Sequence, residues 1–293
     1  MIFSFLNSSI KRPKRVVILG TSGIISTNLQ KKLKKEKLNF IKIGKKNIDF
    51  KNKKSIQFLK SKIKDNDFII FISAEAPAKN LIMKKNNILI CQNICAAIEK
   101  KNFSHIIYIS SDAVYSDIKY KIKENSVTKP SSVHGKMHLR RENILKSYFK
   151  NSLCIIRPTL VYGPGDTHCG YGPNKFVNST LKNKEITLFG NGEEKRDHIY
   201  INDLILIIYK CILLKAVGII NAVSGKVYSF EKIAKFTNKI FRKNNSILKL
   251  TRVGPMPHNG FRPFDNSLIK KHFKEIKTTK IEEGIKKYIS LIK

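Results

Sequence analysis

Tryptophan is absent from this chain of 293 residues, and no apolar run is long enough to cross a membrane. The longest apolar region, residues 204–220, is interrupted by Lys210 and Lys215. The N-terminal sequence MIFSFLNSSIKRPKR lacks the order of a secretory signal, because its positive charges follow a very short apolar run. We therefore expect a cytoplasmic protein that has no membrane partner.

Cysteine is sparse, and its spacing excludes the common disulfide frameworks and metal motifs. An odd number of cysteines without a secretory signal indicates reduced thiols. Cys91 and Cys95 lie four residues apart in an expected helix, where that spacing only places them on one face. We expect no metal site. The five cysteines are Cys91, Cys95, Cys154, Cys169 and Cys211.

Acidic residues are also few: 21 Asp and Glu stand against 57 Lys and Arg, for a formal net charge of +36. Such an excess is typical of proteins that bind RNA or an anionic membrane. The alternative is compositional drift in an AT-rich genome, and the abundant Lys, Ile and Asn favour it. Lysine-rich segments such as residues 31–37 contain no interleaved aromatic platform for bases. We therefore expect no nucleic-acid partner, although the charge would help an anionic nucleotide to approach.

The segment RVVILGTSGIISTNL, residues 15–29, predicts a strand, a glycine turn and a helix. Its four apolar residues 16–19 are typical of a strand buried on both faces. Gly20 and Gly23 would let a diphosphate approach the backbone at the N-terminus of the helix. The third position of this nucleotide-binding fingerprint is Ser26, a small residue that close packing of helix and strand can tolerate. An ordinary strand-to-helix turn is the alternative.

Further strands and helices alternate along the first half of the chain. This alternation predicts an α/β fold with a Rossmann-like, doubly wound parallel sheet. Expected strands are residues 40–43, 67–73, 105–110 and 153–156, and expected helices are 55–63 and 87–98. Lys45 and Lys46 follow the strand 40–43, where an NAD-selective site usually carries an acid for the ribose 2′-hydroxyl. Two lysines suit a 2′-phosphate, so we expect NAD or NADP, with a lean toward NADP.

Several motifs occur in an order that resembles the extended short-chain dehydrogenase/reductase family, the NAD-dependent nucleotide-sugar epimerases and dehydratases. They are GTSGIIS at the first turn, IDF at Asp49, DFIIFISA ending at Ala74, YISSDAVY, RPTLVYGPGD, RDHIYINDL and RPFD. The resemblance implies a dinucleotide-binding domain and a smaller C-terminal α/β substrate lobe. The expected ranges are a basic leader 1–14, a dinucleotide-binding domain 15–162 plus about 198–224, and a substrate lobe 163–197 and 225–293.

The resemblance also implies which residues contact the ligands. Arginines are suited to a diphosphate because a guanidinium offers a planar fork of donors and keeps its charge. Two arginines, Arg196 and Arg262, are expected to bind the diphosphate of the substrate. The alternative is that they form salt bridges with the nearby Asp197 and Asp265. The expected cofactor residues are Gly20, Ser22, Gly23, Ile24, Ile25, Lys45, Asp49, Phe50, Ala74, Asn93, His138 and Pro158. The expected substrate residues are Tyr162, Asn174, Arg196 and Arg262, with further polar contacts from His168 and Lys175.

The sequence departs from the family at the catalytic centre. Ser111 matches the family's Ser or Thr, but His134 and His138 stand where the family has Tyr-x-x-x-Lys. In one hypothesis His134 performs the acid/base step, since an imidazole titrates near neutral pH, and His138 orients the ribose or the other imidazole. In a second the site has lost hydride chemistry and only binds ligand. A third, metal binding by the two histidines, lacks a third ligand.

Asp112 bears on the type of reaction. In sugar 4,6-dehydratases an Asp-Glu pair follows the catalytic Thr, whereas Ala113 stands at the second position here. A dehydratase of that type is therefore disfavoured, and Asp112 is either an auxiliary acid or a hydrogen-bonding residue at the strand end. We predict an NAD(P)-dependent epimerase or ketoreductase for a nucleotide sugar. A catalytically silent binder is the alternative, an RNA-binding relative is a weaker one, and a homodimer is a family expectation.

Overall fold

The computed structural model describes residues 3–166, 170–242 and 246–292. Contacts between Cα atoms divide the chain into two compact units. The first comprises residues 1–116, 124–158 and 205–221, and the second comprises 117–123, 159–204 and 222–293. Each unit is described separately below.

The first unit is built on a seven-stranded sheet with the order β1-β10-β6-β5-β4-β2-β3. Strands β2 to β6 pair in parallel, with Val17 opposite Ile41 on one side and Ile69 on the other. The expected Rossmann-like α/β fold is confirmed. The strands are β1 (Ser4–Phe5), β2 (Val16–Leu19), β3 (Phe40–Ile43), β4 (Phe68–Phe71), β5 (His105–Ile109), β6 (Leu153–Pro158) and β10 (Ala216–Ala222).

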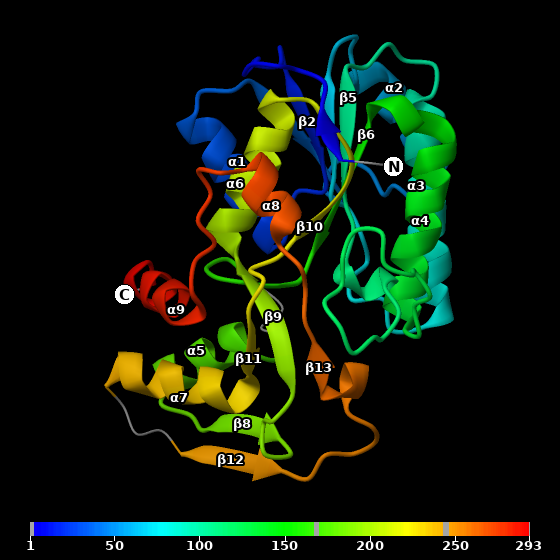
Figure 1. The fold of residues 1–293 in the computed structure, drawn as a ribbon. Coiled ribbons are helices and arrows are strands. Elements are labelled where there is room, and N and C mark those ends of the chain that lie inside the picture. The colour runs from blue at the N-terminus through cyan, green and yellow to red at the C-terminus, as the bar shows by residue number, and fades with distance from the viewer. Residues whose placement is uncertain (1–2, 167–169, 243–245, 293) are drawn as a thin grey trace. The chain divides into compact units, whose positions relative to one another are not determined.

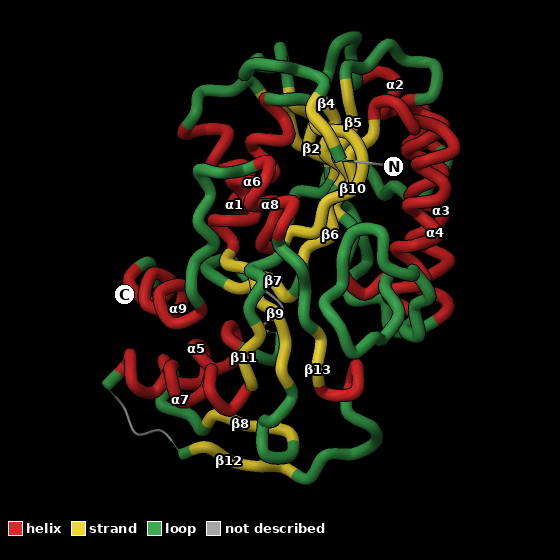
Figure 2. Tube along the Cα trace, viewed as in Figure 1, coloured by secondary structure: helices red, strands yellow, loops and turns green. Residues whose placement is uncertain are grey.

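Helices cover both faces of this sheet (Figure 1, Figure 2). Helices α2 (Lys54–Lys62), α3 (Leu81–Ile98) and α4 (Val133–Phe149) lie on one face, and α1 (Ile24–Lys35) and α6 (Ile201–Leu213) lie on the other. Alternate strand residues form the core beneath α3 and α4, because successive side chains of a strand point to opposite faces. This core includes Val17, Leu19, Ile69, Phe71, Ile106 and Tyr108, packed with Ile90, Ile94 and Leu145.

The described part of the N-terminal segment is attached to the sheet. Ser4–Phe5 pair antiparallel with β10, so part of the predicted basic leader is the edge strand of the sheet. Backbone hydrogen bonds from Asn7 and Lys11 to the carbonyls at the end of α6 extend this attachment. The segment satisfies carbonyl groups that the end of a helix leaves unpaired, which the charge pattern alone could not indicate.

The second unit contains two smaller sheets. Strand β9 (Lys195–Tyr200) pairs antiparallel with β11 (Val227–Ser229) and parallel with β7 (Leu160–Tyr162) and β13 (Phe261–Arg262). Strands β8 (Ile186–Phe189) and β12 (Ile247–Leu250) form a separate parallel pair. The helices of this unit are α5 (Pro173–Leu181), α7 (Phe230–Phe241), α8 (Ser267–His272) and α9 (Ile281–Ser290).

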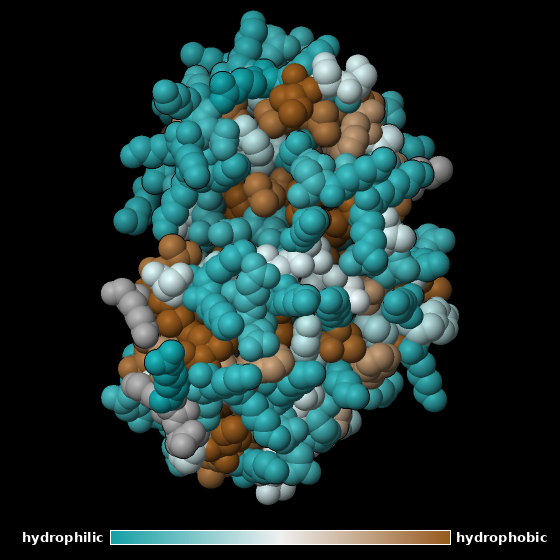
Figure 3. Space-filling view, turned by 60° about the vertical axis from the view of Figure 1, so that its left-hand side comes forward, coloured by the Kyte–Doolittle hydropathy of each residue, from teal (hydrophilic) through white to brown (hydrophobic). Residues whose placement is uncertain are grey.

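Hydrophilic side chains cover most of the face shown in Figure 3, with smaller apolar patches between them. In the described part of the chain, no helix is both long and apolar enough to cross a membrane. The described residues also include three short 3₁₀ turns: η1 (Asp112–Val114), η2 (Lys150–Ser152) and η3 (Pro257–Gly260).

His105 makes the stability of the first unit depend on pH. Its side chain is buried at the start of β5, and Nε2 lies 2.5 Å from the carbonyl of Ala216. Burial lowers the pKa of His105 from 6.5 to about 4. The unfolded chain therefore binds the proton more tightly, so stability is complete above pH 6.5 and is lost as the pH falls toward 4.

Between pH 6.5 and pH 4, protonation of His105 should lower the free energy of unfolding by about 3 kcal/mol. Urea unfolding followed by circular dichroism from pH 7 to pH 4 measures the loss. The variant H105Q should show a flatter pH profile than the unsubstituted protein. An equal slope in both proteins would contradict the assignment.

Candidate functional site

The turn between β2 and α1 places the backbone of residues 20–23 at the carboxyl end of β2. Gly20 has φ = +111°, and a Cβ added there would lie 2.7 Å from the backbone nitrogen of Ser73, so only glycine fits. Gly23 is the N-cap of α1, and no side chain caps the amides that follow it. The first turn of α1 contains no acidic residue. This geometry suits an anion, because helix N-termini carry partial positive charge and unpaired N–H donors.

Ser26 occupies the third fingerprint position as a fully buried residue. Its Oγ donates a hydrogen bond of 2.5 Å to the carbonyl of Gly20 and accepts one of 3.0 Å from Gln30. The hydroxyl therefore joins the helix to the turn where the family pattern has only close packing. The prediction that a serine can replace glycine at this closely packed position is consistent with the burial of Ser26.

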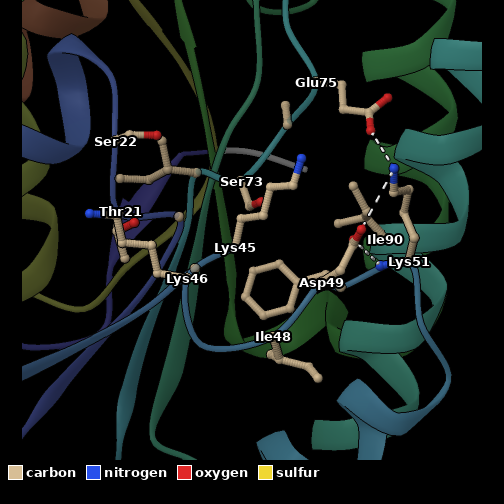
Figure 4. A pocket seen from close by; sticks show the side chains of 15 residues that line it. Thr21, Ser22, Lys45, Lys46, Ile48, Asp49, Lys51, Ser73, Glu75 and Ile90 are labelled. Atoms are coloured by element: carbon tan, nitrogen blue, oxygen red, sulfur yellow. Dashed lines mark hydrogen bonds and ion pairs between the residues drawn. The ribbon is translucent and has the colours of Figure 1, made fainter.

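A cavity of about 420 Å³ lies at the carboxyl ends of β2, β3 and β4 (Figure 4). Ligands of open α/β sheets bind at this edge. Among the predicted cofactor residues, those lining the cavity are Gly20, Ser22, Lys45, Asp49, Phe50 and Ala74. Lining residues that the sequence analysis did not single out for this role include Thr21, Gly44, Ile48, Lys51, Ser73, Glu75 and Ile90. Gly23, Ile24, Ile25, Asn93, His138 and Pro158 are not among the described lining residues, and their contacts with a cofactor stay predictions.

Lys51 connects two carboxylates of the cavity (Figure 4). Its ammonium lies 3.0 Å from Glu75 Oε1 and 3.7 Å from Asp49 Oδ2. The hydrogen bond with Glu75 raises the pKa of Lys51. Burial alone would raise the pKa of Glu75, but hydrogen bonds from Asn86 and Lys51 outweigh it and lower that pKa. Both groups are therefore charged at neutral pH.

Lys45 and Lys46 supply further positive charge after β3. Both side chains are exposed and line the cavity. In Figure 4 the side chain of Lys45 extends toward Ser73, whereas that of Lys46 lies beside Thr21. The cavity thus offers more cationic than anionic side chains to a phosphorylated ligand.

Two buried asparagines of α3 hold the backbone of the cavity wall. Asn93 Nδ2 donates to the carbonyls of Phe50 at 2.8 Å and Lys51 at 3.2 Å. Asn87 Oδ1 accepts from the amide of Glu75 at 2.9 Å, and its Nδ2 donates back to the Glu75 carbonyl. The structure therefore gives Asn93, predicted to bind cofactor, a role in shaping the site through the chain it supports.

Ser111 and Asp112 follow β5 at the start of η1. Ser111 Oγ accepts from the amide of Ala113 at 3.2 Å and donates to Asp112 Oδ1 at 3.4 Å. Asp112 is only 7% exposed. Helix α4 approaches this turn closely at Gly135, where an added Cβ would lie 2.0 Å from the Ala113 carbonyl oxygen. Glycine is required there because the helix and the turn leave no room for a side chain.

His134 lies half-buried in the first turn of α4. Its Nδ1 accepts a hydrogen bond of 3.3 Å from the amide of Ala78. Burial lowers the pKa of His134, the charge of Arg141 lowers it further, and nearby Asp112 opposes the shift. A helix N-terminus also disfavours a cationic imidazole. A neutral ring whose Nδ1 is the acceptor carries its hydrogen on Nε2.

His138 lies one turn further along α4 and is 5% exposed. Its Nδ1 is 2.6 Å from the hydroxyl of Tyr108 on β5, and burial lowers its pKa well below 6.5. Its ring packs edge-on against His134, with 4.6 Å between the ring centroids. This packing is compatible with the predicted role of orienting the other imidazole, and both that role and the ribose contact stay predictions.

A buried ion pair anchors α4 to β6. Glu142 accepts from Arg157 Nε at 2.8 Å and Nη2 at 2.5 Å, and from Ser110 Oγ at 2.6 Å. Both charged side chains are almost fully buried. The Arg157 guanidinium also lies over the ring of Tyr115, at 4.8 Å from its centroid. This cluster fixes α4, and with it both histidines, against the sheet.

The predicted substrate residues belong to the second unit. Arg196 pairs with Glu194 at 3.2 Å, and Arg262 pairs with Asp117 at 2.7 Å. Asn174 accepts from the Gly163 amide and donates to Asp166, so it braces its own loop. The substrate contacts of Arg196, Arg262 and Asn174 therefore stay predictions.

Tyr162 is buried, and its hydroxyl lies where an added Cβ at Gly284 of α9 would be only 1.9 Å away. This position gives the ring a packing role, and its contact with substrate stays a prediction. His168 and Cys169, which the sequence analysis also considered, lie outside the described residues. The described residues contain no group of three or more His, Cys, Asp or Glu arranged to hold a metal ion.

Sequence reasoning missed Tyr108, Arg141 and the amide of Ala78. Arg141 could have been found from helical spacing, because residues 134, 138, 141 and 145 recur on one face of α4. Tyr108 lies inside an apolar strand, where nothing marks it as a partner of a histidine. The Ala78 contact depends on a backbone group, which sequence patterns do not reveal.

The fold and the cavity define a Rossmann-like protein whose glycine turn and helix N-terminus fit a dinucleotide. The chain belongs to the NAD dependent epimerase/dehydratase family, whose family model matches residues 16–222. The family predicted from the sequence motifs is therefore confirmed.

Individual relatives are distant. A dTDP-D-glucose 4,6-dehydratase of Dictyostelium discoideum is 25% identical over 235 residues, covering 66% of this chain and 54% of that protein. The chain thus matches about half the length of this relative. A putative UDP-glucose 4-epimerase of Methanocaldococcus jannaschii is 25% identical over 216 residues, covering 64% and 70%. The UDP-glucose 4-epimerase of Thermus thermophilus, solved with NAD, shares the fold with a TM-score of 0.83, at 17% identity over 94% of this chain and 98% of that chain.

Proposed function

We propose that the protein is an NAD(P)-dependent enzyme that acts on a nucleotide sugar as an epimerase or ketoreductase. The family supports a nucleotide-sugar substrate and a nicotinamide cofactor. The N-terminus of α1 supports the cofactor. Among the described residues beyond its chain neighbours, no atom lies within 4 Å of where a Cβ at Gly23 would stand, so an anion can approach the uncapped amides of the first turn. When bound, the dinucleotide would supply or accept hydride at a carbon of the sugar.

In this proposal His134 would give its Nε2 proton to the reacting sugar oxygen as the carbonyl carbon is reduced, and the ring would regain a proton from water. The observation that carries this role is the hydrogen bond from the Ala78 amide to Nδ1, which directs Nε2–H away from that contact. A neutral imidazole in this tautomer donates a hydrogen bond to a carbonyl or a developing alkoxide. It can accept a proton at Nε2 only after the tautomer changes. Reduction of a keto sugar is therefore favoured over oxidation of an alcohol, and ketoreduction is the first reaction to test.

Ser111 and Asp112 complete the centre as proposed. Ser111 would hydrogen-bond the same sugar oxygen by giving up its weak contact of 3.4 Å with Asp112. Asp112 would act as an auxiliary acid or hold the end of β5. Tyr108 holds His138 by a hydrogen bond, and the His138 ring packs edge-on against His134 and so positions it. A dehydratase of the Asp-Glu type stays disfavoured, because Ala113 holds the second position.

For the cofactor, Lys45 and Lys46 support NADP over NAD. Exposed lysines at the end of β3 would pair with a ribose 2′-phosphate, whereas the cavity's carboxylates, Asp49 and Glu75, are already engaged with Lys51. We further propose a cytoplasmic homodimer as the working form, on the strength of the family expectation alone.

The function is tested by titrating the purified protein with NADH and NADPH, followed by a panel of nucleotide 4-keto sugars and nucleotide sugars. We expect NADPH to bind more tightly than NADH, and its absorbance at 340 nm to fall on addition of one keto sugar. Product analysis by mass spectrometry and NMR then distinguishes reduction from epimerisation. Dinucleotide binding without hydride exchange for any sugar would favour the catalytically silent binder. Absence of dinucleotide binding would refute the proposal and direct the next titration to RNA at two salt concentrations.

A further inference from the structure

Arg141 is a buried cation that no carboxylate in the described part of the chain neutralises. Its side chain is fully buried on α4, and its hydrogen bonds go to a carbonyl, an amide oxygen and a thioether. Its Nε has no hydrogen-bond partner among the described residues. A charge buried without an anion costs several kcal/mol in typical proteins. Such a group calls for a functional explanation.

The contacts of Arg141 lie directly behind the candidate site. Nη2 donates a hydrogen bond of 2.7 Å to the carbonyl of Ser73, a residue that lines the dinucleotide cavity. Nη1 lies 3.5 Å from Asn87 Oδ1, the same atom that accepts from the Glu75 amide. The guanidinium thus supports residues 73–75 of the cavity wall, on the side of the wall that faces the protein interior.

Aromatic rings surround the rest of the guanidinium. It lies 4.3 Å from the ring centroid of Phe71 and 5.1 Å from that of Tyr108. The faces of these rings partly compensate the charge. Tyr108 in turn bonds His138, so one chain of contacts joins Arg141 to the histidine pair.

We propose that Arg141 is a positioning residue that supplies the fixed positive charge of the site, in place of the lysine that His138 replaces. An arginine keeps its charge in a buried position, whereas a lysine loses it more readily. The charge would favour the anionic dinucleotide in the cavity and disfavour a second proton on either imidazole. The assignment to a dinucleotide site rests on the proposed function, whereas the effect on the histidines does not.

Other charged and titratable groups also face the histidines. Asp112 of η1 favours a cationic His134, and the His138 and His134 rings disfavour each other's protonation. Tyr108 of β5 is held neutral, because burial raises the pKa of its hydroxyl. Arg141 is the cation that acts on both rings. Removal of its charge should therefore raise both histidine pKa values while Asp112 and Tyr108 remain.

The test compares two substitutions at Arg141 with a matched control. R141M removes the charge, and R141Q removes it but keeps an N–H donor for Ser73. R140M removes the same charge from the exposed neighbouring position on α4. The histidine pKa values are read by ¹⁵N NMR of the imidazoles in the protein without ligand. Dinucleotide affinity is read by calorimetry, and folding by circular dichroism.

We expect R141M and R141Q to raise the pKa of His134 and His138 and to weaken dinucleotide binding by about five- to tenfold, as loss of a charged contact typically does. R140M should leave the histidine pKa values unchanged. The comparison remains decisive if R141M does not fold, because R141Q retains the contact with Ser73. Unchanged pKa values in R141Q, or an equal rise in R140M, would overturn the electrostatic role. A rise in pKa in a protein that binds no dinucleotide would refute the proposed function and leave this role intact.

Discussion

Replacing His134 by asparagine should lower kcat by about 10²- to 10⁴-fold, the usual contribution of a positioned acid or base. The shorter side chain would lack the Nε2–H that we assign to proton donation. Its amide oxygen could still accept from the Ala78 amide, as the histidine Nδ1 does at 3.3 Å. The loop around Ala78 would therefore keep its position, and dinucleotide affinity should change by no more than about threefold.

The measurement is single-turnover oxidation of the bound dinucleotide with the keto sugar that the function test identifies. The matched control is K136M, which alters an exposed residue in the same turn of α4 and should leave kcat unchanged. The pH profile gives a second readout. Because burial and Arg141 lower the pKa of His134, activity that requires the neutral ring should persist below pH 6.5 and decline only as the pH reaches that lowered pKa. Turnover by H134N at the rate of the unsubstituted protein would refute the role of this residue.

Replacing Glu142 by glutamine should lower the free energy of unfolding of the first unit by about 3–5 kcal/mol, the usual cost of breaking a buried ion pair. Arg157 would then be a buried cation without its carboxylate, since Glu142 supplies both of its short ion-pair contacts. Ser110 would also lose the charge on its acceptor. The loss exceeds that of a surface pair because neither group is screened by water.

Chemical unfolding must be followed by circular dichroism, since the chain has no tryptophan to report by fluorescence. The control is K146M, which removes the partly exposed third partner at 3.5 Å from Glu142 and should cost less than about 1 kcal/mol. The double variant E142L/R157M should recover much of the stability, because it leaves no unpaired charge. If E142Q unfolds at the same urea concentration as the unsubstituted protein, the ion pair does not stabilise the first unit.

The fold was predictable because its signals are local. Apolar runs such as residues 16–19, a glycine turn and a helical repeat specify the parallel strands β2 to β6 of the first unit and several of its helices before any tertiary contact forms. The order of these elements leaves few topologies for a parallel sheet, since the connections are right-handed and short. The turn at Gly20 was predictable for the same reason, as its backbone geometry requires glycine.

The interior of the site was less predictable. Asn93 was predicted to touch cofactor, and the structure adds a hydrogen bond from its amide to the chain at Phe50, which is distant in sequence. Tyr162 was predicted to touch substrate, and the structure adds that its hydroxyl lies against Gly284 of α9. Both ligand contacts stay predictions. In both cases the residue type was compatible with binding and with packing. Only the position of a neighbouring element distinguishes the two.

The sequence by itself determined the family, the α/β fold, the glycine turn and the replacement of Tyr-x-x-x-Lys by two histidines. The tertiary structure decided how those histidines are held: the Ala78 amide selects a tautomer of His134, and Tyr108 engages His138. It also placed the charge of Arg141, which no carboxylate among the described residues neutralises, behind the cavity wall. The physical reason is that strands and helices follow from patterns within a segment. Tautomers and buried charges follow from groups that are far apart in the chain and meet only when it folds.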